Sequence, residues 1–153
     1  MAGLHLQQLR TACLALGTSY STALSAAGLT PLAATEGEPR RQTKATHRPE
    51  LAVSFEGDRA REQMALGAPV DLEITVSFAV RVWGDEAAAL GYEGVLEQLL
   101  AGSGPTITAA VTDAAVNRWE LAGGDSSADE ERTNRDAWQV TVTVRVGMEV
   151  SAS

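Results

Sequence analysis

Two long stretches in which apolar and polar residues alternate strictly constrain this chain more than any other feature. Every second residue from 70 to 82 is apolar, and from 138 to 150 the alternation recurs with valine at five of its seven apolar positions. Successive side chains of a strand point to opposite faces, so both stretches predict strands with one buried face, paired antiparallel. Each would be roughly 43 Å long at the usual rise per residue. Since that exceeds the diameter of a small domain, their ends must project, bend or pair with another chain.

Apolar residues recurring at intervals of three and four predict two helices. The first covers residues 4–26 and stops near Gly28. The second starts after Asp85, an N-cap residue, and ends before Gly102, with Pro105 preventing its resumption. The apolar stripe expected on the first helix consists of Leu6, Leu9, Cys13, Leu16, Tyr20 and Leu24.

Weaker patterns predict short strands over residues 51–55, 106–111 and 116–121, and a charged connection over 57–69 with a helical turn around 60–66. Two amphipathic helices and a sheet with one apolar face must cover one another. We therefore expect one α+β domain over residues 1–153. It would be an α/β sandwich in which a mainly antiparallel sheet of about four to five strands has two helices packed on one face.

Residues 31–49 show no periodicity and contain three of the five prolines, so they predict an extended, exposed arm. The arm is locally basic although the chain has a net charge of −8. A solvated loop and a docking arm for an acidic neighbour are equally compatible with this pattern. The basic residues that would form the contact are Arg40, Arg41, Lys44 and Arg48.

Residues 123–136 contain no apolar residue larger than alanine and are rich in acidic side chains, which predicts a mobile acidic loop. Asp129, Glu130 and Glu131 could supply the opposite charge to the basic arm of a neighbouring subunit. Together with Asp125 they could also hold a divalent cation, but the spacing of a calcium loop is missing. A solvated acidic loop is favoured over the cation site.

Composition argues against several classes of protein. Excess negative charge disfavours a general nucleic-acid binder, and a single cysteine excludes an intramolecular disulfide. A Cys13–His47 nucleophilic pair is less plausible than a buried, inert thiol, because Cys13 lies in the apolar stripe of the first helix. Trp83, Trp119 and Trp138 are expected to pack in the core or at a sheet edge rather than to line a ligand pocket. We expect no enzyme activity, no cofactor, no metal and no membrane span.

The order of elements resembles the tail terminator proteins of long-tailed bacteriophages and related gene-transfer particles. The resemblance is carried by residues 72–100, where the alternation ITVSFAVRVWGDEAAAL runs directly into a helix, and by the long strand over residues 138–150. It rests on the order and character of the elements, and the acidic segment 123–136 has no counterpart in it.

The resemblance implies an α/β fold and a structural role without catalysis. Family members assemble as a hexameric ring on the finished tail tube, stop its polymerisation and present a surface to the neck proteins. The partners implied are further copies of this chain, the tail tube protein and a neck or head-completion protein, with no membrane and no sequence-specific nucleic acid. The place implied is the tail–neck junction of a virion assembled in the bacterial host cytoplasm.

Two other functions are compatible with the same pattern. Another head–tail connector or a tail-tube component would share the ring architecture. A small ligand-binding or enzymatic α+β domain would instead need a pocket between its sheet and its helices.

Overall fold

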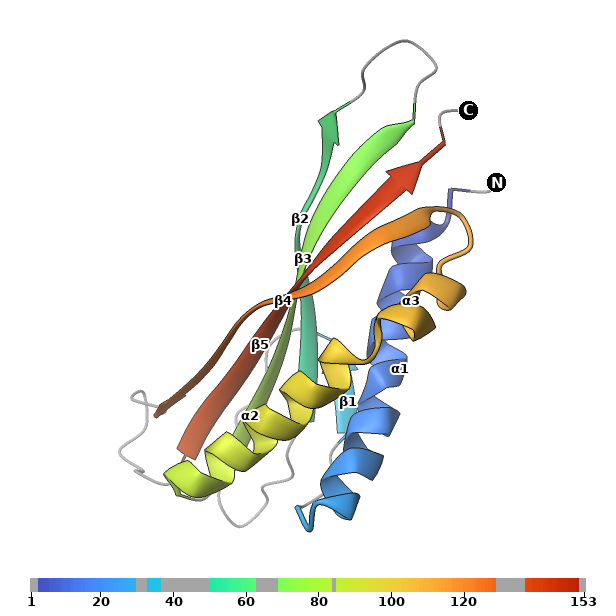
Figure 1. The fold of residues 1–153 in the computed structure, drawn as a ribbon. Coiled ribbons are helices and arrows are strands. Elements are labelled where there is room, and N and C mark those ends of the chain that lie inside the picture. Colours follow the sequence, from blue (N-terminus) through green and yellow to red (C-terminus); the bar gives the residue numbers. More distant parts are fainter. Residues whose placement is uncertain are drawn as a thin grey trace.

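A computed structural model describes residues 3–29, 33–36, 50–62, 69–83, 85–128 and 137–151. These residues form three helices and five strands, and the predicted α+β class is confirmed (Figure 1). In chain order the elements are α1 (His5–Ala26), β1 (Ala33–Glu36), β2 (Glu50–Glu62), β3 (Val70–Trp83), α2 (Glu86–Ala101), α3 (Gly104–Ala110), β4 (Ala115–Ala128) and β5 (Ala137–Val150).

The five strands form one sheet in the order β1-β2-β3-β5-β4. The four long strands pair antiparallel with their neighbours, and β1 adds to the free edge of β2 in parallel. The two strands with the clearest alternation, β3 and β5, lie side by side at the centre of the sheet along their whole length. The long strands predicted from the period-two pattern are therefore the central strands of the fold.

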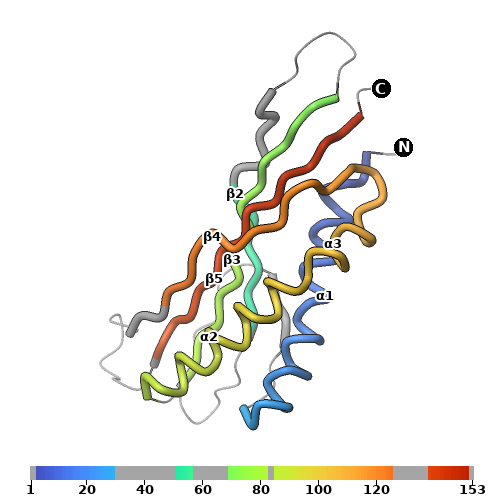
Figure 2. The backbone as a smooth tube through the Cα atoms, viewed as in Figure 1, coloured from blue at the N-terminus to red at the C-terminus, as the bar shows by residue number. Residues whose placement is uncertain are grey.

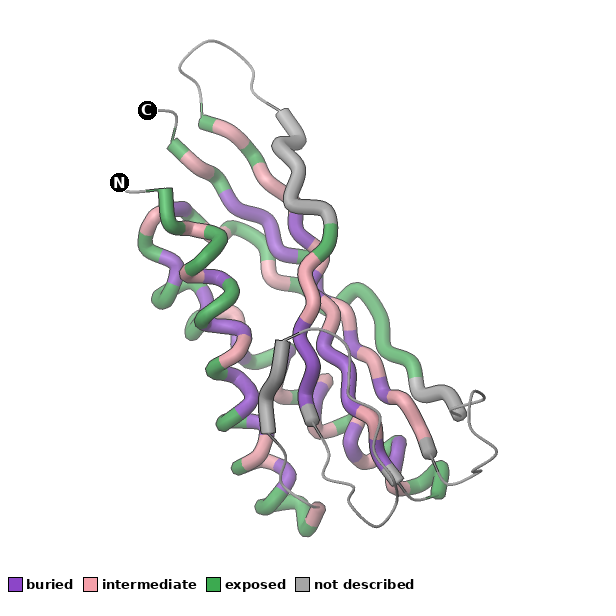
Figure 3. Tube along the Cα trace, turned by 180° about the vertical axis from the view of Figure 1, so that it is seen from behind, coloured by how far each residue is buried: buried purple, intermediate pink, exposed green. Residues whose placement is uncertain are grey.

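The hydrophobic core lies between one face of this sheet and the three helices. Val76 of β3 is opposite Val144 of β5, Phe78 is opposite Val142, and all four side chains are fully buried. Helix α1 contacts β1 and β2, α2 contacts β3, β4 and β5, and α3 contacts β4. Figure 3 shows buried residues in purple along the helices and the adjoining strands. The predicted burial of the alternating apolar face against the helices is confirmed.

A buried hydrogen bond links α1 to α2. The Tyr20 hydroxyl of α1 donates a buried hydrogen bond of 2.8 Å to the carbonyl oxygen of Tyr92 on α2. Burial raises the pKa of Tyr20, so this hydroxyl keeps its proton.

At the start of α2, the Asp85 carboxylate accepts a hydrogen bond of 2.9 Å from the Ala88 amide, which confirms the predicted N-cap.

Helix α3 corrects the prediction of a strand over residues 106–111. Pro105 lies in the first turn of this helix, where a missing N–H breaks no hydrogen bond. It therefore starts a new helix instead of only preventing α2 from continuing. Ile107 is the buried residue of this seven-residue helix, so there was no helical periodicity to detect.

Three segments predicted to be irregular are partly strand. Residues 33–36 of the expected arm form β1, residues 57–62 of the expected connection extend β2, and residues 123–128 of the expected acidic loop extend β4. The helical turn expected around 60–66 is wrong for residues 60–62, and the rest of that turn lies outside the described part of the chain. Register shifts within β2 and β4 interrupt the period of two, and residues 57–62 and 123–128 contain no apolar residue larger than alanine, so no alternation is visible there.

The long strands extend beyond the layer of helices at one end of the sheet. Figure 1 shows β2, β3 and β5 running past the first turn of α1, and Figure 2 shows the same for β3 and β5, at the end where Val70 of β3 is opposite Val150 of β5. Val70, Leu72 and Val150 continue the apolar face there, and each of them is only partly buried. The expectation that the strand ends project is met at this end.

Candidate functional site

The residues predicted from sequence to form a contact with a partner lie outside the described part of the chain. This holds for Arg40, Arg41, Lys44 and Arg48 of the basic arm and for Asp129, Glu130 and Glu131 of the acidic segment. The structure describes only the strands that flank these segments.

The flanking strands place the ends of both segments at the same end of the sheet. The basic segment leads into β2, whose Leu51 is opposite Val80 of β3. The acidic segment joins Ala128 of β4 to Ala137 of β5, and Ala137 is opposite Trp83 of β3. Only three strand spacings, about 14 Å, separate β2 from β4 in the sheet.

An apolar groove with a volume of about 370 Å³ lies toward the other end of the sheet, between the first half of α1 and strands β2 and β3. Leu9 and Ile74 form its buried floor, Phe55 is partly buried, and Leu6 at its rim is 40% exposed. The lining residues are Leu6, Gln7, Leu9, Arg10, Phe55 and Ile74.

The groove exists because two covering elements end too early. Strand β1 pairs with β2 only as far as Val53, so the edge of β2 near Phe55 has no strand beside it in the described part of the chain. Helix α1 begins at His5, while the apolar face of the sheet continues to Val70 and Val150. Neither element covers Phe55 or Leu72 fully.

The first turn of α1 that borders this groove is held firmly in place. The Gln8 side-chain oxygen accepts hydrogen bonds from the amides of Thr112 and Asp113, at 2.9 and 3.0 Å. The Asp113 carboxylate in turn accepts a 2.9 Å hydrogen bond from the Leu4 amide. These contacts satisfy an unpaired N–H group at the helix start and fix the position of Leu6 relative to the sheet. The groove is consequently preformed.

A second hollow, of about 470 Å³, lies on the other side of Gln7. Alanines contribute much of its wall, and Leu4 at its rim is 47% exposed. The two hollows give the first half of α1 an apolar surface on both flanks. Its lining residues are Leu4, Gln7, Gln8, Thr11, Ala12, Ala15 and Ala110.

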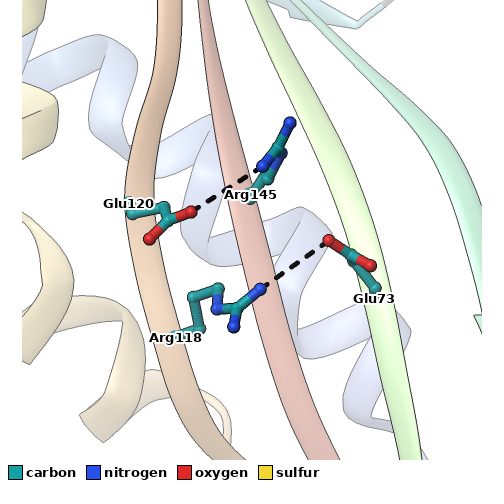
Figure 4. A network of polar contacts seen from close by, with 4 residues as sticks. All are labelled: Glu73, Arg118, Glu120 and Arg145. Atoms are coloured by element: carbon teal, nitrogen blue, oxygen red, sulfur yellow. Dashed lines mark ion pairs between the residues drawn. The ribbon is translucent and has the colours of Figure 1, made fainter. Parts of the chain in front are cut away.

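The sheet face away from the helices is polar and carries ion pairs between strands (Figure 4). Arg118 of β4 lies 3.8 Å from Glu73 of β3, and Arg145 of β5 lies 4.0 Å from Glu120 of β4. All four side chains are between about 30% and 55% exposed, so each pair contributes little to stability.

Helix α2 presents two carboxylates to β4. A Cβ atom added at Gly124 would lie 3.0 Å from a carboxylate oxygen of Glu93 and still closer to one of Glu97. Gly124 thus allows the acidic side chains of α2 to lie directly against the strand. Through this sequence without large apolar residues, β4 stays paired with β5 as far as Ala128.

The burial of the side chains decides between the roles considered for Cys13 and for the tryptophans. Cys13 is fully buried, and desolvation raises its thiol pKa to about 12, so it is no nucleophile at neutral pH. Trp119 donates a 2.7 Å hydrogen bond to the Leu100 carbonyl and, like Trp138, packs against the core. This agrees with the predicted packing role for these two tryptophans, whereas the Trp83 side chain and His47 lie outside the description.

Within the described ranges, no cluster of three or more His, Cys, Asp or Glu side chains is arranged to hold a metal ion. Residues 129–131, the other members of the cation site considered for Asp125, lie outside these ranges. None of the described helices is both long and apolar enough to cross a bilayer.

Comparison with known proteins adds no family. No protein-family model matches the chain, and no curated protein matches it significantly.

The structure adds the apolar groove, which the sequence patterns did not predict. Leu6 and Phe55 were both assigned to apolar patterns, but nothing in those patterns showed that they would stay partly exposed.

Proposed function

We propose that this protein is a structural subunit that assembles into a ring and acts as a tail terminator of a phage or phage-like particle. In that role it caps the tail tube, stops its polymerisation and joins the tail to the neck. The proposal rests on the sequence resemblance described above, and two features of the fold support it.

The first supporting feature is the arrangement of the elements. A long strand, β3, leads within three residues into α2, and helices cover one face of a mainly antiparallel sheet. This is the arrangement that the resemblance implies.

The second feature, which carries most weight, is the incompletely covered apolar end of the sheet. Burying the exposed surface of Leu6, Phe55 and Leu72 would stabilise the protein, and within one subunit Phe55 and Leu72 are only partly buried and Leu6 is 40% exposed. Partly exposed apolar surface next to a rigid helix is typical of a contact with another protein chain. A subunit of an assembly needs such contacts, and a ring needs two different ones per subunit.

Mass photometry and negative-stain microscopy of the purified protein, alone and with isolated tail tubes, test the proposal. We expect rings of one fixed stoichiometry that bind one end of a tube and prevent further addition of tube protein. Rings that stack continuously would instead indicate a tube component, and rings that bind only a neck complex would indicate another connector. A protein that forms no rings and binds no tube would contradict the proposal.

A further inference from the structure

The helical side of the molecule has a region almost without charge, formed by α1 and by residues 98–112, which include α3. Figure 1 shows α3 beside the first half of α1, and the two helices are in contact. The region contains one charged residue, Arg10, in a chain of which 21% of the residues are charged. Depletion of charged side chains is typical of the centre of a protein–protein interface. Among its exposed residues are Leu4, Gln7, Thr11, Ala15, Ala109 and Ala110.

We infer that two copies of this chain pair through this region, with their α1 helices antiparallel about a two-fold axis. Leu4 at the start of α1 is 47% exposed and lies at the rim of the hollow of about 470 Å³. Ala12 and Ala15 of α1 and Ala110 of α3 contribute to the wall of this hollow. A protruding leucine and a hollow that can receive one thus belong to the same surface. A two-fold contact requires such a self-complementary surface, because each copy inserts its leucine into the other.

The spacing of residues along α1 fits this arrangement. Leu4, Gln8, Thr11 and Ala15 recur at intervals of four, three and four, so they lie along one line of the helix surface. When the two helices are aligned antiparallel about a point midway between Gln8 and Thr11, Leu4 of each copy is next to Ala15 of the other. The small side chains of Thr11 and Ala15 allow the helices to approach closely there.

The polar groups of this surface already have hydrogen-bond partners within one subunit. The Gln8 side-chain oxygen accepts hydrogen bonds from the Thr112 and Asp113 amides, and its nitrogen donates one of 3.1 Å to the Thr112 hydroxyl. The Asp113 carboxylate accepts a hydrogen bond from the Leu4 amide. Covering these groups therefore costs less than burying polar groups that have only water as a partner.

Charge favours a second copy of this chain as the partner. A strongly basic or acidic partner would find almost no opposite charge on this region, so the partner must itself present an uncharged surface, and a second copy does. The net charge of −8 makes two copies repel each other over most of their surfaces. The repulsion is weakest where α1 and α3 face α1 and α3. Because the contact contains no ion pair, added salt should leave the association unchanged or strengthen it.

The two-fold contact differs from the head-to-tail contacts that close a ring. It therefore goes beyond the proposed function. Two free subunits would pair through it, and two rings would be held face to face where rings form. The contact and the ring can consequently fail separately.

Disulfide trapping tests the contact directly. Protein carrying Leu4→Cys is mixed with protein carrying Ala15→Cys and oxidised, and Leu90→Cys replaces Leu4→Cys in the matched control. Leu90 is 52% exposed on α2 and does not line the hollow, and the native Cys13 is buried. We expect at least ten times more mixed disulfide with Leu4→Cys than with Leu90→Cys. Equal yields would overturn the inference.

The same two positions exclude a false result from within one chain. Leu4 and Ala15 are eleven residues apart along a helix, a distance of about 16 Å, which no disulfide can bridge. Any disulfide in the double variant Leu4→Cys/Ala15→Cys must therefore join two copies.

Sedimentation of the unmodified chain and of two arginine variants provides the second test. Ala15→Arg places a bulky charge at the hollow and should keep the wild-type melting temperature while weakening association at least tenfold. Leu90→Arg changes the net charge equally, away from the hollow, and should associate at least as tightly as wild type. A wild-type protein that stays monomeric at every concentration, or equal association of the two variants, would overturn the inference. If wild type pairs but forms no rings, the contact stands and the ring function is wrong.

Discussion

Arg118 of β4 reaches across Gly147 of β5 to Glu73 of β3, with 3.8 Å between its Nη1 atom and the carboxylate Oε1 atom (Figure 4). Both charged residues are opposite Gly147 in their ladders. A Cβ atom at position 147 would lie 2.9 Å from the Arg118 Cβ atom and 2.7 Å from the Asn117 side-chain oxygen. Gly147 thus makes room for a side chain that crosses a whole strand.

Replacing Gly147 by alanine should therefore lower the free energy of unfolding. The Arg118 Cβ atom is attached directly to the backbone and cannot move away cheaply, so we expect a loss of about 1–3 kcal/mol. Urea denaturation measures it. Gly123→Ala is the matched control, because a Cβ atom there would have no neighbour within 4 Å. Equal stability of both variants would show that the strand spacing adapts without cost.

Arg118→Ala should have a much smaller effect than Gly147→Ala. Both partners of the ion pair are about one third or more exposed, so we expect a loss below about 1 kcal/mol that decreases as salt is added. Denaturation in low and high salt checks this expectation. A loss above about 2 kcal/mol would mean that Arg118 contributes more than this one pair.

A charge on the buried face of the central strands should destabilise the fold severely. Val76→Asp or Val144→Asp would place a carboxylate at a fully buried position without a partner, at a cost above about 3 kcal/mol. Thermal melting by circular dichroism measures this, and Ser77→Asp, one residue along and pointing to the other face, should cost less than about 1 kcal/mol. Wild-type melting temperatures for both buried variants would disprove the assignment of the core.

The stability of the fold should fall in alkaline solution partly because of Cys13. Its folded-state pKa is raised from 9.0 to about 12, so the folded state holds this proton more tightly than the unfolded state does. The stabilising contribution of the protonated Cys13 thiol is fully present below pH 9. As the pH rises toward 12 this contribution is lost, and the free energy of unfolding falls by at most about 1.4 kcal/mol per pH unit. The Cys13→Ala variant should lose less stability over this range. If the free energy of unfolding depends on pH equally in wild type and in Cys13→Ala, the raised pKa of the buried thiol is contradicted.

The acidic segment should tolerate replacement only in part. A short Gly-Ser linker in place of residues 129–136 leaves all of β4 paired and should keep the fold. The same linker in place of residues 123–136 removes the strand pairs of β5 from Thr143 to Trp138 and should unfold that end of the sheet. Circular dichroism with thermal melting distinguishes the two. Equal stability would mean that residues 123–128 contribute no structure.

Charge reversal of the basic arm tests assembly through charge. The triple variant Arg40→Glu/Arg41→Glu/Lys44→Glu should fold normally and form fewer rings, with a larger defect at low salt, where like charges repel more. Adding Asp129→Lys, Glu130→Lys and Glu131→Lys should restore the rings if the two segments pair. Negative-stain counts of rings and of normal-length tails measure the effect. Normal assembly of the triple variant would exclude the arm from it.

The two longer helices and the central strands were predictable because the apolar residues of each recur with a continuous period. The fold class followed from these elements. Helix α3 was not predictable, since its seven residues bury only Ile107. The full lengths of β2 and β4 were hidden by bulges and by the lack of large apolar residues over 57–62 and 123–128. The residue types near Gly123 have a low propensity for strands and favour a loop. Pairing with the regular strand β5 outweighs this preference.

The candidate site was less predictable because it depends on where neighbouring elements stop. Leu6 and Leu9 belong to the same helical stripe, yet Leu9 is buried and Leu6 is 40% exposed. The difference arises because β1 ends opposite Val53 and leaves the next part of β2 uncovered. No local pattern encodes the length of a strand that pairs across the chain.

The pairing of β3 with β5 over fourteen residues also sets a length scale for any assembly of this subunit. The groove and the projecting ends of β2, β3 and β5 lie toward one end of these strands, and the flanks of the charged segments lie at the other, at most about 45 Å away. The sheet is thus a rigid spacer between two regions of contact. A one-residue insertion would turn the apolar side chains beyond it to the wrong face, so the spacer can change only by two residues at a time, in both strands together.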